Sequence, residues 1–317
     1  MSYIVTGGCG FIGSNFVNYL CNVTDNPVFV IDKMTYAASE DNIDLKHLSS
    51  GQVRLYKCDL ALGCDALDKI LEHNEVHGIF HFAAESHVDN SITGPRAFID
   101  ANILGTFNLL EAIRTKDIQC RYLHISTDEV YGALLEDGPS FLESKLLEPN
   151  NVYSATKASS DLIVRSFNKT YGLDVVTTRC CNNFGPRQHK EKLLPKVISN
   201  ALSDTNIPVY GKGDNIREWI YVKDHCKAIL DVFNKGETNE VYNIGTGVEV
   251  TNLNLVKKIL KLLGKPLSLI KFVNDRPGHD FRYSIDCRKF NNLIPNFNYM
   301  NFDDGLEETI RWYKERS

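Results

Sequence analysis

The sequence lacks an excess of basic residues and any long apolar run. Its 35 Lys and Arg are outnumbered by 40 Asp and Glu, which gives a formal net charge of -5 at pH 7. Because binding to a nucleic-acid backbone or an anionic membrane depends on clustered positive charge, we expect neither partner. No stretch approaches the roughly 18 apolar residues of a membrane-spanning helix. Small molecules are therefore the expected partners.

Cysteines at the spacing of a metal site are also missing. The nine cysteines are odd in number and scattered, without the paired spacing of metal ligands. This pattern favours reduced thiols, and because the N-terminus has no basic leader, we expect a cytoplasmic protein without a metal site. The adjacent Cys180 and Cys181 are open to a redox reading, but small buried hydrophobic side chains are the commoner use of such residues.

Short apolar runs alternate with helix-length segments over roughly the first 180 residues. The runs cover residues 2–6, 28–32, 53–57, 78–83, 121–127 and 173–179. Between them, residues 11–23, 96–114 and 154–170 carry apolar side chains at helical spacing. This alternation predicts an α/β fold with a doubly wound parallel sheet of the Rossmann type.

The alternation becomes irregular beyond residue 184, where Pro186, Pro195, Pro208, Gly211 and Gly213 interrupt it. We expect a smaller mixed α/β lobe there. Residues 241–244 resemble a further buried strand that rejoins the main sheet. The expected division is a first domain of residues 1–183 plus about 217–247, and a substrate lobe of about 184–216 plus 248–317.

A glycine-rich turn follows the first expected strand. Gly7, Gly10 and Gly13 open the next helix, so that backbone N–H groups and the helix N-terminus can meet a pyrophosphate. Asp32 ends the second strand, where a carboxylate accepts from a ribose diol and repels a 2'-phosphate; this favours NAD over NADP. Asp32 is alternatively a cap or turn aspartate, and Asp59 either accepts from adenine or caps the following helix.

Tyr153 and Lys157 stand four residues apart on an expected helix, so their side chains emerge on the same face. A phenol with a pKa near 10 is a poor base at neutral pH. We expect two cations, Lys157 and an oxidised nicotinamide, to lower that pKa. Such a pair also occurs by chance on amphipathic helices, but the glycine turn favours a functional reading.

The triplet Thr127, Asp128 and Glu129 ends the fifth apolar run. A plain alcohol dehydrogenase has no evident use for two adjacent carboxyl groups, so the pair suggests elimination of water. Successive strand residues point to opposite faces, so the backbone must leave strand geometry near Thr127 if both acids act on one substrate. Alternatively, one acid is catalytic while the other caps or pairs.

Other polar residues are weaker candidates. His87 has no second histidine at ligand spacing, so a positioning or structural role is expected rather than metal binding. Arg217, Arg276 and His279 lie in the second lobe, where cations can clamp a substrate diphosphate.

Together these residues resemble the nucleotide-sugar 4,6-dehydratases of the extended short-chain dehydrogenase/reductase superfamily, and among them the dTDP-glucose 4,6-dehydratases. The resemblance covers nearly the whole chain. It is carried by residues 6–14 (TGGCGFIGS), 82–91 (FAAESHVDNS), 126–132 (STDEVYG), 153–160 (YSATKASS), 179–186 (RCCNNFGP), 191–195 (EKLLP), 209–222 (VYGKGDNIREWIYV) and 276–283 (RPGHDFRY).

The resemblance implies a role for each residue of the reacting group. Thr127 would hold the sugar O4 while Tyr153, tuned by Lys157, removes its proton and NAD takes hydride from C4. Glu129 would then remove the C5 proton as Asp128, kept protonated by its neighbour and by burial, donates to the departing C6 hydroxyl. Return of hydride to C6 would regenerate NAD in place.

The resemblance also implies binding residues and a partner. For the cofactor they are Gly7, Gly10, Phe11, Ile12, Gly13, Asp32, Lys33, Thr35, Asp59, Leu60, Ala83, Ala84, Ser126, Tyr153, Lys157 and Asn182. For the nucleotide sugar they are Ser86, His87, Asn182, Lys192, Leu193, Tyr210, Arg217, Asn252, Arg276, His279 and Tyr283. A homodimer formed through residues 96–114 and 154–170 is expected as well.

The chain departs from the family pattern in places. The segment between Gly132 and Tyr153 is short, Asn151 and Val152 replace the usual Ser-Pro, and Phe281 stands where an arginine is common. The alternatives are a UDP-sugar 4-epimerase or decarboxylase on the same scaffold, or a non-catalytic NAD-sensing protein. Retention of both acids favours dehydration over the former, and retention of the tyrosine, lysine and threonine favours catalysis over the latter. Thymine or uracil, and glucose or N-acetylglucosamine, remain open.

Overall fold

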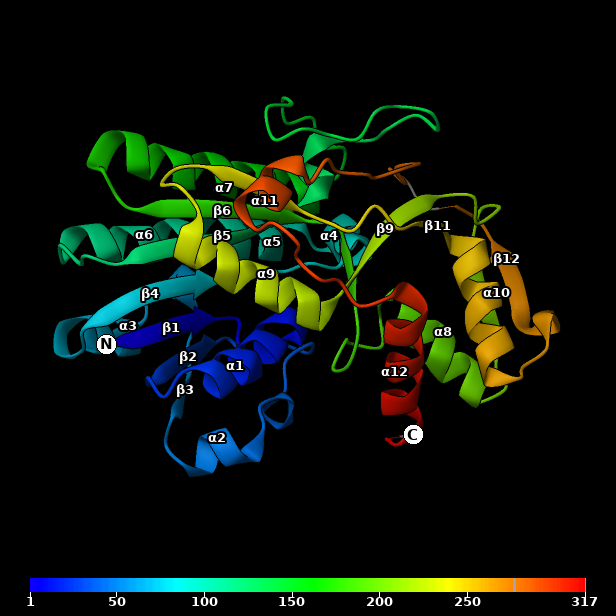
Figure 1. The fold of residues 1–317 in the computed structure, drawn as a ribbon, viewed down its shortest axis with the longest axis horizontal. Helices are drawn as coiled ribbons and strands as arrows, with labels where there is room; N and C mark the ends of the chain where they lie inside the picture. Colours follow the sequence, from blue (N-terminus) through cyan, green and yellow to red (C-terminus); the bar gives the residue numbers. More distant parts are fainter. Residues whose placement is uncertain (276–277, 317) are drawn as a thin grey trace.

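A parallel sheet forms the larger part of the molecule. The computed structural model describes residues 1–275 and 278–316, and within them a seven-stranded sheet has the order β10-β6-β5-β4-β1-β2-β3 (Figure 1). Every pair of neighbours in it is parallel, as the sequence predicts. Its strands are β1 (Ser2–Thr6), β2 (Val28–Asp32), β3 (Val53–Lys57), β4 (Val76–His81), β5 (Arg121–Thr127), β6 (Val175–Cys180) and β10 (Val241–Ile244).

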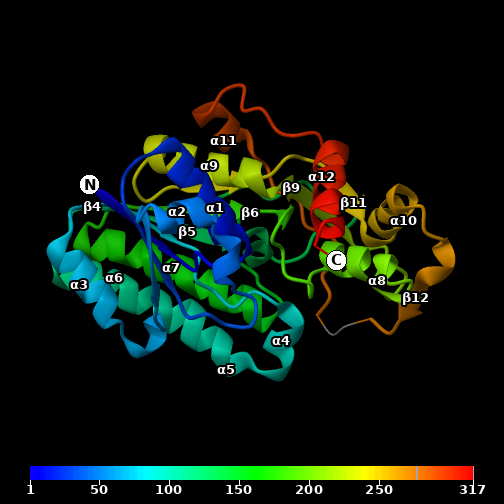
Figure 2. The same ribbon diagram turned by 90° about the horizontal axis from the view of Figure 1, so that it is seen from below.

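Helices cover both faces of this sheet (Figure 2). One face carries α1 (Phe11–Val23) and α9 (Val222–Lys235), and the other carries α3 (Asp65–His73), α6 (Gly105–Thr115) and α7 (Val152–Tyr171). Every residue of β1, β2 and β6 is buried. A strand that is buried on both faces has a continuous run of apolar residues, which explains why these strands could be predicted from the sequence.

The expected helix over residues 96–114 is formed by three segments. These are α5 (Pro95–Phe98), a π-helix, η3 (Ile99–Leu104), and α6. A π-helical turn inserts extra residues into the helical repeat, so apolar spacing alone does not reveal it. The remaining elements of this part are α2 (Leu45–Ser49), α4 (Val88–Thr93), and the 3-10 helices η1 (Glu40–Asn42), η2 (Leu60–Leu62) and η4 (Asp128–Tyr131).

A second lobe lies beyond the carboxyl edge of the sheet (Figure 1). It holds a three-stranded sheet, β7 (Asn182–Phe184), β9 (Ile216–Tyr221) and β11 (Glu249–Thr251), and the pair β8 (Ile207–Tyr210) and β12 (Ile270–Val273). Its helices are α8 (Leu193–Leu202), α10 (Asn252–Leu263), η5 (Leu267–Leu269) and α12 (Phe302–Lys314), while α11 (Arg288–Leu293) lies near β10. A separate apolar core containing Leu194, Trp219 and Leu255 holds this lobe together.

The chain returns from the second lobe to the main sheet. After β9, α9 packs on α1, and β10 pairs in parallel with β6 from Val241–Thr177 to Ile244–Cys180. The prediction that residues 241–244 rejoin the sheet is therefore confirmed. The two lobes are thus joined by more than one crossing of the chain.

One cysteine expectation is wrong. The structure has a disulfide between Cys58 and Cys64, whose Cα atoms are 5.9 Å apart, whereas the scattered spacing predicted reduced thiols throughout. The turn of η2 brings these two residues together, which their separation in the sequence does not disclose. The other seven cysteines, including Cys180 and Cys181, are free.

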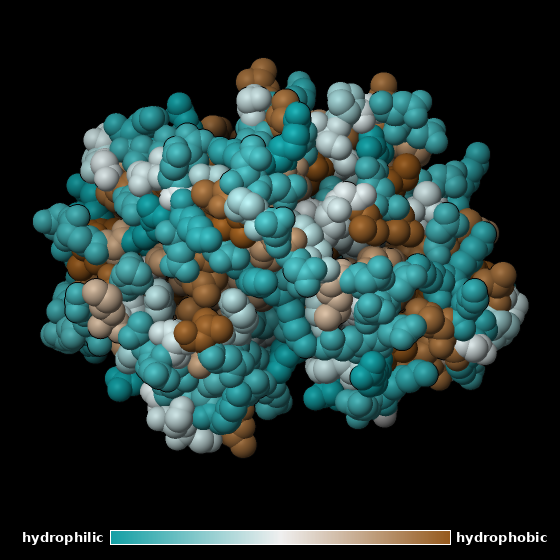
Figure 3. Space-filling model, in the orientation of Figure 1, coloured by the Kyte–Doolittle hydropathy of each residue, from teal (hydrophilic) through white to brown (hydrophobic). Residues whose placement is uncertain are grey.

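The surface fits the composition. In the view of Figure 3 it is mostly hydrophilic, with apolar side chains in small, scattered patches. Within the described part of the chain, no helix has the length and apolar character needed to cross a membrane.

Candidate active site

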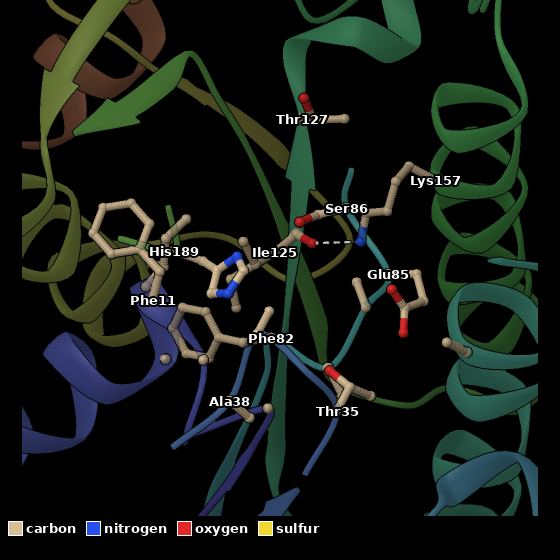
Figure 4. Close-up of a pocket in the computed structure, with 18 of the residues that line it drawn as sticks. Phe11, Thr35, Ala38, Phe82, Glu85, Ser86, Ile125, Thr127, Lys157 and His189 are labelled. Atoms are coloured by element: carbon tan, nitrogen blue, oxygen red, sulfur yellow. Dashed lines mark hydrogen bonds between the residues drawn. The ribbon is translucent and has the colours of Figure 1, made fainter. Parts of the chain in front are cut away.

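A cavity of ≈ 300 Å³ lies at the carboxyl ends of the parallel strands. Figure 4 shows part of its lining, with aromatic side chains on one side and polar ones on the other. The sequence-predicted residues that line it are Gly7, Gly10, Phe11, Ile12, Gly13, Asp32, Lys33, Thr35, Asp59, Leu60, Ala83, Ala84, Ser86, Ser126, Thr127, Asp128, Glu129, Tyr153, Lys157, Asn182 and Lys192. The structure therefore brings the glycine turn, the acid pair and the Tyr-Lys pair to one cavity.

The glycine turn is closely packed against itself. Gly7 has a φ of 67°, and a Cβ on Gly13 would lie 2.2 Å from the Gly7 carbonyl oxygen. No side chain caps α1 at Gly10, and its first turn holds no acidic residue. The N-terminus of α1 thus faces the cavity with its backbone dipole uncompensated by a side chain, which suits a bound anionic group.

Asp32 supports the turn from the end of β2. Its carboxylate accepts hydrogen bonds from the Cys9 N–H at 2.9 Å and the Met34 N–H at 2.7 Å. The turn role that the sequence left open is therefore observed, and Asp32 lines the cavity as well. Burial raises the pKa of Asp32, and these two N–H groups oppose that rise.

Asp59 caps a 3-10 helix and also forms an ion pair beside the cavity. Its side chain accepts from the Ala61 N–H at 3.0 Å, which caps η2, so the capping alternative is observed. It also forms an ion pair with Lys33 at 2.7 Å. Asp59 and Lys33 both line the cavity. They follow β3 and β2, whereas Asp128 and Glu129 follow β5, so the ion pair lies at the end of the cavity away from these two acids.

The backbone leaves strand geometry at Thr127, as expected. The strand β5 ends there and the 3-10 helix η4 begins at Asp128. The Thr127 hydroxyl accepts from the Glu129 N–H at 3.3 Å and donates to the Asp128 carboxyl at 3.2 Å. This turn allows two successive acids to line the same cavity, which an extended strand would not.

Asp128 is the more buried of the two acids, with 1% of its surface exposed. Burial raises the pKa of Asp128 well above its usual range, and the charges of Glu129 and Glu218 raise it further. Glu218 itself accepts from the N–H groups of Thr246, Gly247 and Ile285. A buried carboxyl beside other carboxylates is a proton donor at neutral pH.

Tyr153 and Lys157 lie on α7 and are both buried. The Lys157 ammonium donates to the Ile125 carbonyl at 2.7 Å, the contact drawn in Figure 4. Burial lowers the pKa of Lys157 to about 8, against the opposing influence of Asp161 and Cys180. The Thr127 hydroxyl at the end of β5 lowers the pKa of Tyr153 but does not offset burial.

In the protein without cofactor, burial decides the protonation of Tyr153. Burial raises the pKa of Tyr153 well above its usual value, and Glu129 and Cys180 raise it further; the Thr127 hydrogen bond lowers it. Desolvation of the phenolate is thus the largest influence on the tyrosine in the cofactor-free protein. We expect the positive charge of a bound nicotinamide to be needed, together with the Lys157 ammonium, before the phenol loses its proton.

Sequence reasoning missed several lining residues. They are Ile31, Ala37, Ala38, Cys58, Ala61, Phe82, Glu85, Ala101, Ile125, Cys180, Cys181, Asn183, Gln188, His189 and Glu191. Phe82 and Glu85 lie in a stretch that carries the family resemblance, so their place at the end of β4 was a usable signal. Glu191 likewise begins the stretch 191–195 that carries the resemblance, whereas Gln188 and His189 come from a loop without periodicity, and nothing in their spacing points to the cavity.

Lys192 is the described second-lobe candidate that lines the cavity; Leu193, Tyr210, Arg217, Asn252, His279 and Tyr283 do not line it. Arg217 is 5% exposed; it donates to the carbonyls of Ile216, Asp280 and Phe281, and its guanidinium lies 4.4 Å from the Tyr283 ring centre. Tyr283 in turn donates to the Asp280 carboxylate at 2.5 Å.

Tyr210 and Lys192 of this lobe contact the first domain, and His279 lies beside Tyr210. The Tyr210 hydroxyl donates to Asp89 at 3.2 Å, and Asp89 lies 3.8 Å from His87. The His279 ring lies 6.2 Å from that of Tyr210, and its Nδ1 is 2.6 Å from Asp275. Lys192 donates to the Ser86 carbonyl at 2.7 Å.

Two further candidates of this lobe, Leu193 and Asn252, lie at the starts of helices. Leu193 begins α8, and the Asn252 N–H donates to the Asn215 carbonyl at 3.0 Å. Arg276 lies outside the described residues. Among those described, no group of His, Cys, Asp or Glu is arranged to hold a metal ion.

The cavity suits a dinucleotide at both of its ends. The glycine turn can pack this closely only because Gly13 has no Cβ, its backbone N–H groups lie at the N-terminus of α1 where a pyrophosphate can bind, and Asp32 lies at the end of the adjacent strand. At the other end a phenol, a lysine and a protonated carboxyl surround the space where a nicotinamide would meet a substrate. This arrangement can carry hydride transfer coupled to proton transfer.

Comparison with known proteins agrees with this chemistry. The family model described as GDP-mannose 4,6 dehydratase matches residues 4–309. The low-salt glycan biosynthesis protein Agl12 of Haloferax volcanii is 48% identical over 99% of this chain and 98% of that protein. The dTDP-glucose 4,6-dehydratase of Haemophilus influenzae is 41% identical over 99% of this chain and 98% of its own. The crystal structure of DesIV, a dTDP-glucose 4,6-dehydratase from Streptomyces venezuelae with NAD and TYD bound, matches with a TM-score of 0.94 and 43% identity, over 99% of this chain and 97% of that one.

Proposed function

The chain belongs to the family described as GDP-mannose 4,6 dehydratase, and on that premise we propose that its substrate is dTDP-glucose. It is an NAD-dependent nucleotide-sugar 4,6-dehydratase, a lyase that converts its substrate into the 4-keto-6-deoxy sugar. One observation carries this conclusion: Thr127, Asp128, Glu129, Tyr153 and Lys157 line the same cavity as the glycine turn.

We assign the first proton transfer to Tyr153. The Thr127 hydroxyl, which bonds to Tyr153, orients the sugar O4, and the phenolate takes its proton while the Lys157 ammonium stays protonated nearby. NAD held by the glycine turn and Asp32 would supply the hydride acceptor for C4 and, once reduced, the hydride donor for C6. The positive charge of the oxidised nicotinamide favours the phenolate that burial disfavours.

The two acids divide the elimination step. Oxidation at C4 makes the C5 proton acidic, because the adjacent ketone stabilises the developing negative charge. Glu129 removes that proton, and Asp128, whose pKa burial, Glu129 and Glu218 raise, donates its proton to the departing C6 hydroxyl. The turn at Thr127 lets both carboxyl groups act on one sugar.

We propose that the second lobe binds the nucleotide. The candidates are Lys192, Tyr210, Arg217, Arg276 and His279, which supply cations and ring donors for a diphosphate. Arg217 is bound to backbone carbonyls in the described residues, so its role in this proposal is to support the Tyr283 ring through stacking as well as to add positive charge.

The test is turnover of four nucleotide sugars in parallel. Purified protein is incubated with dTDP-glucose, UDP-glucose, UDP-N-acetylglucosamine and GDP-mannose, and the products are separated and identified by mass. We expect loss of one water from dTDP-glucose at the highest kcat/KM. One methyl group in an apolar pocket contributes about 1 to 3 kcal/mol, so UDP-glucose should be about 10- to 100-fold poorer. A 4-epimer without loss of water would contradict the proposal.

The organisation around the site is proposed as well. We propose that the chain is a cytoplasmic homodimer joined through α5, η3, α6 and α7, and that the cofactor domain is formed by residues 1–183 plus about 217–247. Support for the dimer comes from exposed apolar side chains on these helices: Ile99 at 40%, Leu104 at 38%, Phe107 at 41% and Leu162 at 58%. Burial of such side chains against a second copy would remove apolar surface from water.

A further inference from the structure

The helix that carries the catalytic tyrosine and lysine has a third buried polar residue in line with them. Tyr153, Lys157 and Asp161 are spaced four residues apart on α7, so their side chains leave the same face one turn after another. They are 9%, 4% and 6% exposed. A carboxylate at this depth needs a structural or functional reason.

Asp161 has two partners from neighbouring strands. Its Oδ2 accepts from the Arg179 Nε of β6 at 2.9 Å, and its Oδ1 lies 3.4 Å from the His124 Nε2 of β5. The Arg179 guanidinium also lies 4.7 Å from the Tyr131 ring centre. These contacts fix the carboxylate beneath the sheet's carboxyl edge, one helical turn behind Lys157.

Lys157 is surrounded by groups that carry no charge at neutral pH. Burial lowers the pKa of His81 on β4 well below its usual value, and it lowers that of His124 to about 4. Burial raises the pKa of Cys180 on β6 to about 12. Tyr153 is likewise held protonated by burial.

The charged groups near Lys157 are therefore few. Arg179 is a second buried cation, while Asp161 is an anion: burial alone would favour its neutral form, but Arg179 and His124 lower its pKa to about 2. Asp161 is the principal opposing influence on the fall of the Lys157 pKa, ahead of Cys180. Without Asp161, Lys157 and Arg179 would be two cations buried beside neutral rings.

We propose that Asp161, held by Arg179 and His124, is a positioning residue that keeps the Lys157 ammonium charged and directed at the tyrosine end of the cavity. The inference rests on the proposed function, because it concerns the lysine that supports Tyr153. It extends the reacting group from a tyrosine and lysine to a helical row of three residues with an arginine behind it.

The first experiment replaces the charge of Asp161 without changing its shape. In Asp161→Asn, the pH profile of hydride transfer is measured as NADH absorbance in a single turnover with dTDP-glucose. Because the ammonium loses its counter-charge, the alkaline limb should move to lower pH by about one unit. Asp161→Glu keeps the charge and should keep the limb, even where its extra methylene lowers stability. Asp174→Asn is the matched control, since Asp174 also accepts from an arginine, Arg121, at 2.9 Å, but lies 40% exposed at the opposite end of these strands.

A paired variant covers the case in which Asp161→Asn does not fold. Asp161→Asn with Arg179→Met removes both charges at once, and neutral replacement of a buried ion pair is commonly tolerated. A second readout is independent of activity: Lys157 is titrated in the cofactor-free protein by NMR of 13C-labelled lysine, with Lys157→Met to assign the signal. We expect its pKa to fall below about 8 in both Asn-containing variants.

The outcomes separate the two claims. An active wild type whose alkaline limb and lysine titration are unchanged in folded Asp161→Asn or in the paired variant overturns the positioning role. A wild type that transfers no hydride from any nucleotide sugar overturns the proposed function, while the NMR titration still decides whether Asp161 sustains the lysine charge.

Discussion

Asp128 and Glu129 are adjacent carboxyl groups in different surroundings, and we propose different roles in proton transfer for them. Asp128 is 1% exposed and bonded to Thr127, and its pKa is raised by burial, by Glu129 and by Glu218. Keeping one acid protonated beside another is how a single site holds a proton donor and a proton acceptor at the same pH. The pair thus fits an elimination in which one proton is taken and another is given.

Removing both functions should separate oxidation from elimination. In Asp128→Asn with Glu129→Gln, we expect NADH absorbance to appear with dTDP-glucose but the 4-keto-6-deoxy product to fall by at least about 100-fold, in the range of lost acid-base catalysis. Product is measured by mass and NADH at 340 nm. The matched control is Glu136→Gln with Asp137→Asn, a second adjacent acid pair that is exposed and does not line the cavity. Normal product formation in the first double variant would reject the assignment.

The buried lysine carries a stability cost that depends on pH. Its folded pKa of about 8 lies below the ordinary 10.5, so the folded state resists protonation. The cost is complete below about pH 8, declines as pH rises from 8 to 10.5 and vanishes above that window. It amounts to about 3 kcal/mol, on the order of 1.4 kcal/mol for each pH unit.

Lys157→Met should therefore gain stability relative to wild type at neutral pH, and this gain should shrink by about 1 to 2 kcal/mol between pH 7 and pH 9.5. Urea unfolding of the cofactor-free protein at several pH values measures the difference. Lys261→Met on α10 removes an exposed lysine and serves as the control. A difference between Lys157→Met and wild type that stays constant across this range would contradict the depressed pKa.

Single residues differ in how far the sequence discloses them. Tyr153, Lys157 and the acid pair were predictable because motif spacing and strand ends point to them directly. Asp161 and Arg179 were not, since a polar residue on a helix and another in a strand are ordinary until the sheet brings them to 2.9 Å. The rise in the Tyr153 pKa that burial causes in the cofactor-free protein was not foreseen, because burial is a property of the folded environment rather than of spacing.

The strand-turn-helix unit at the N-terminus depends on close backbone approach. A Cβ on Gly13 would lie 2.2 Å from the Gly7 carbonyl oxygen, a backbone atom that cannot move without disturbing β1. Gly10, in contrast, has a φ of -76°, and a Cβ there would meet the same oxygen at 3.4 Å. The packing of the turn therefore requires glycine at position 13 but not at position 10.

Gly13→Ala should destabilise the fold by about 1 to 3 kcal/mol through overpacking and should also abolish measurable NAD binding. Gly10→Ala should change stability by less than about 1 kcal/mol, because its new methyl fits the free protein. Urea unfolding and calorimetric titration with NAD separate the two effects. Equal stability of both variants would show that the close approach at Gly13 is not a constraint.

Helices and strands were predictable from the sequence where their burial follows one regular pattern. The strands β1, β2 and β6 are buried along their whole length, so continuous apolar runs marked them within a few residues. The π-helix η3 was hidden, because residues 99–104 keep helical character while their hydrogen bonds shift by one residue. The second lobe was recognisable only by the loss of rhythm, since its short strands β7 and β11 span three residues each.

On the scale of the whole molecule, the loop that follows β7 joins the two lobes. Asn15 of α1 donates to the Pro186 carbonyl at 3.0 Å, and Arg187 forms an ion pair with Asp44 at 2.7 Å. Tyr313 of α12 donates to the Gln188 carbonyl of the same loop. The loop that supplies lining residues to the cavity is thus fixed to both lobes.

If the chain forms the proposed dimer, a charge placed on the exposed face of α7 should prevent association. Leu162 on α7 is 58% exposed and Leu267 in the second lobe is 57% exposed, so Leu162→Glu and Leu267→Glu place the same charge at equally accessible sites. Light scattering after size exclusion should give wild type and Leu267→Glu about twice the chain mass of 35.8 kDa, and Leu162→Glu a mass near that of one chain. A charge buried in an apolar interface without a partner opposes association, whereas the same charge in water does not. Because α7 also carries Tyr153, Lys157 and Asp161, a monomeric wild type would remove the dimer as a support for the catalytic helix.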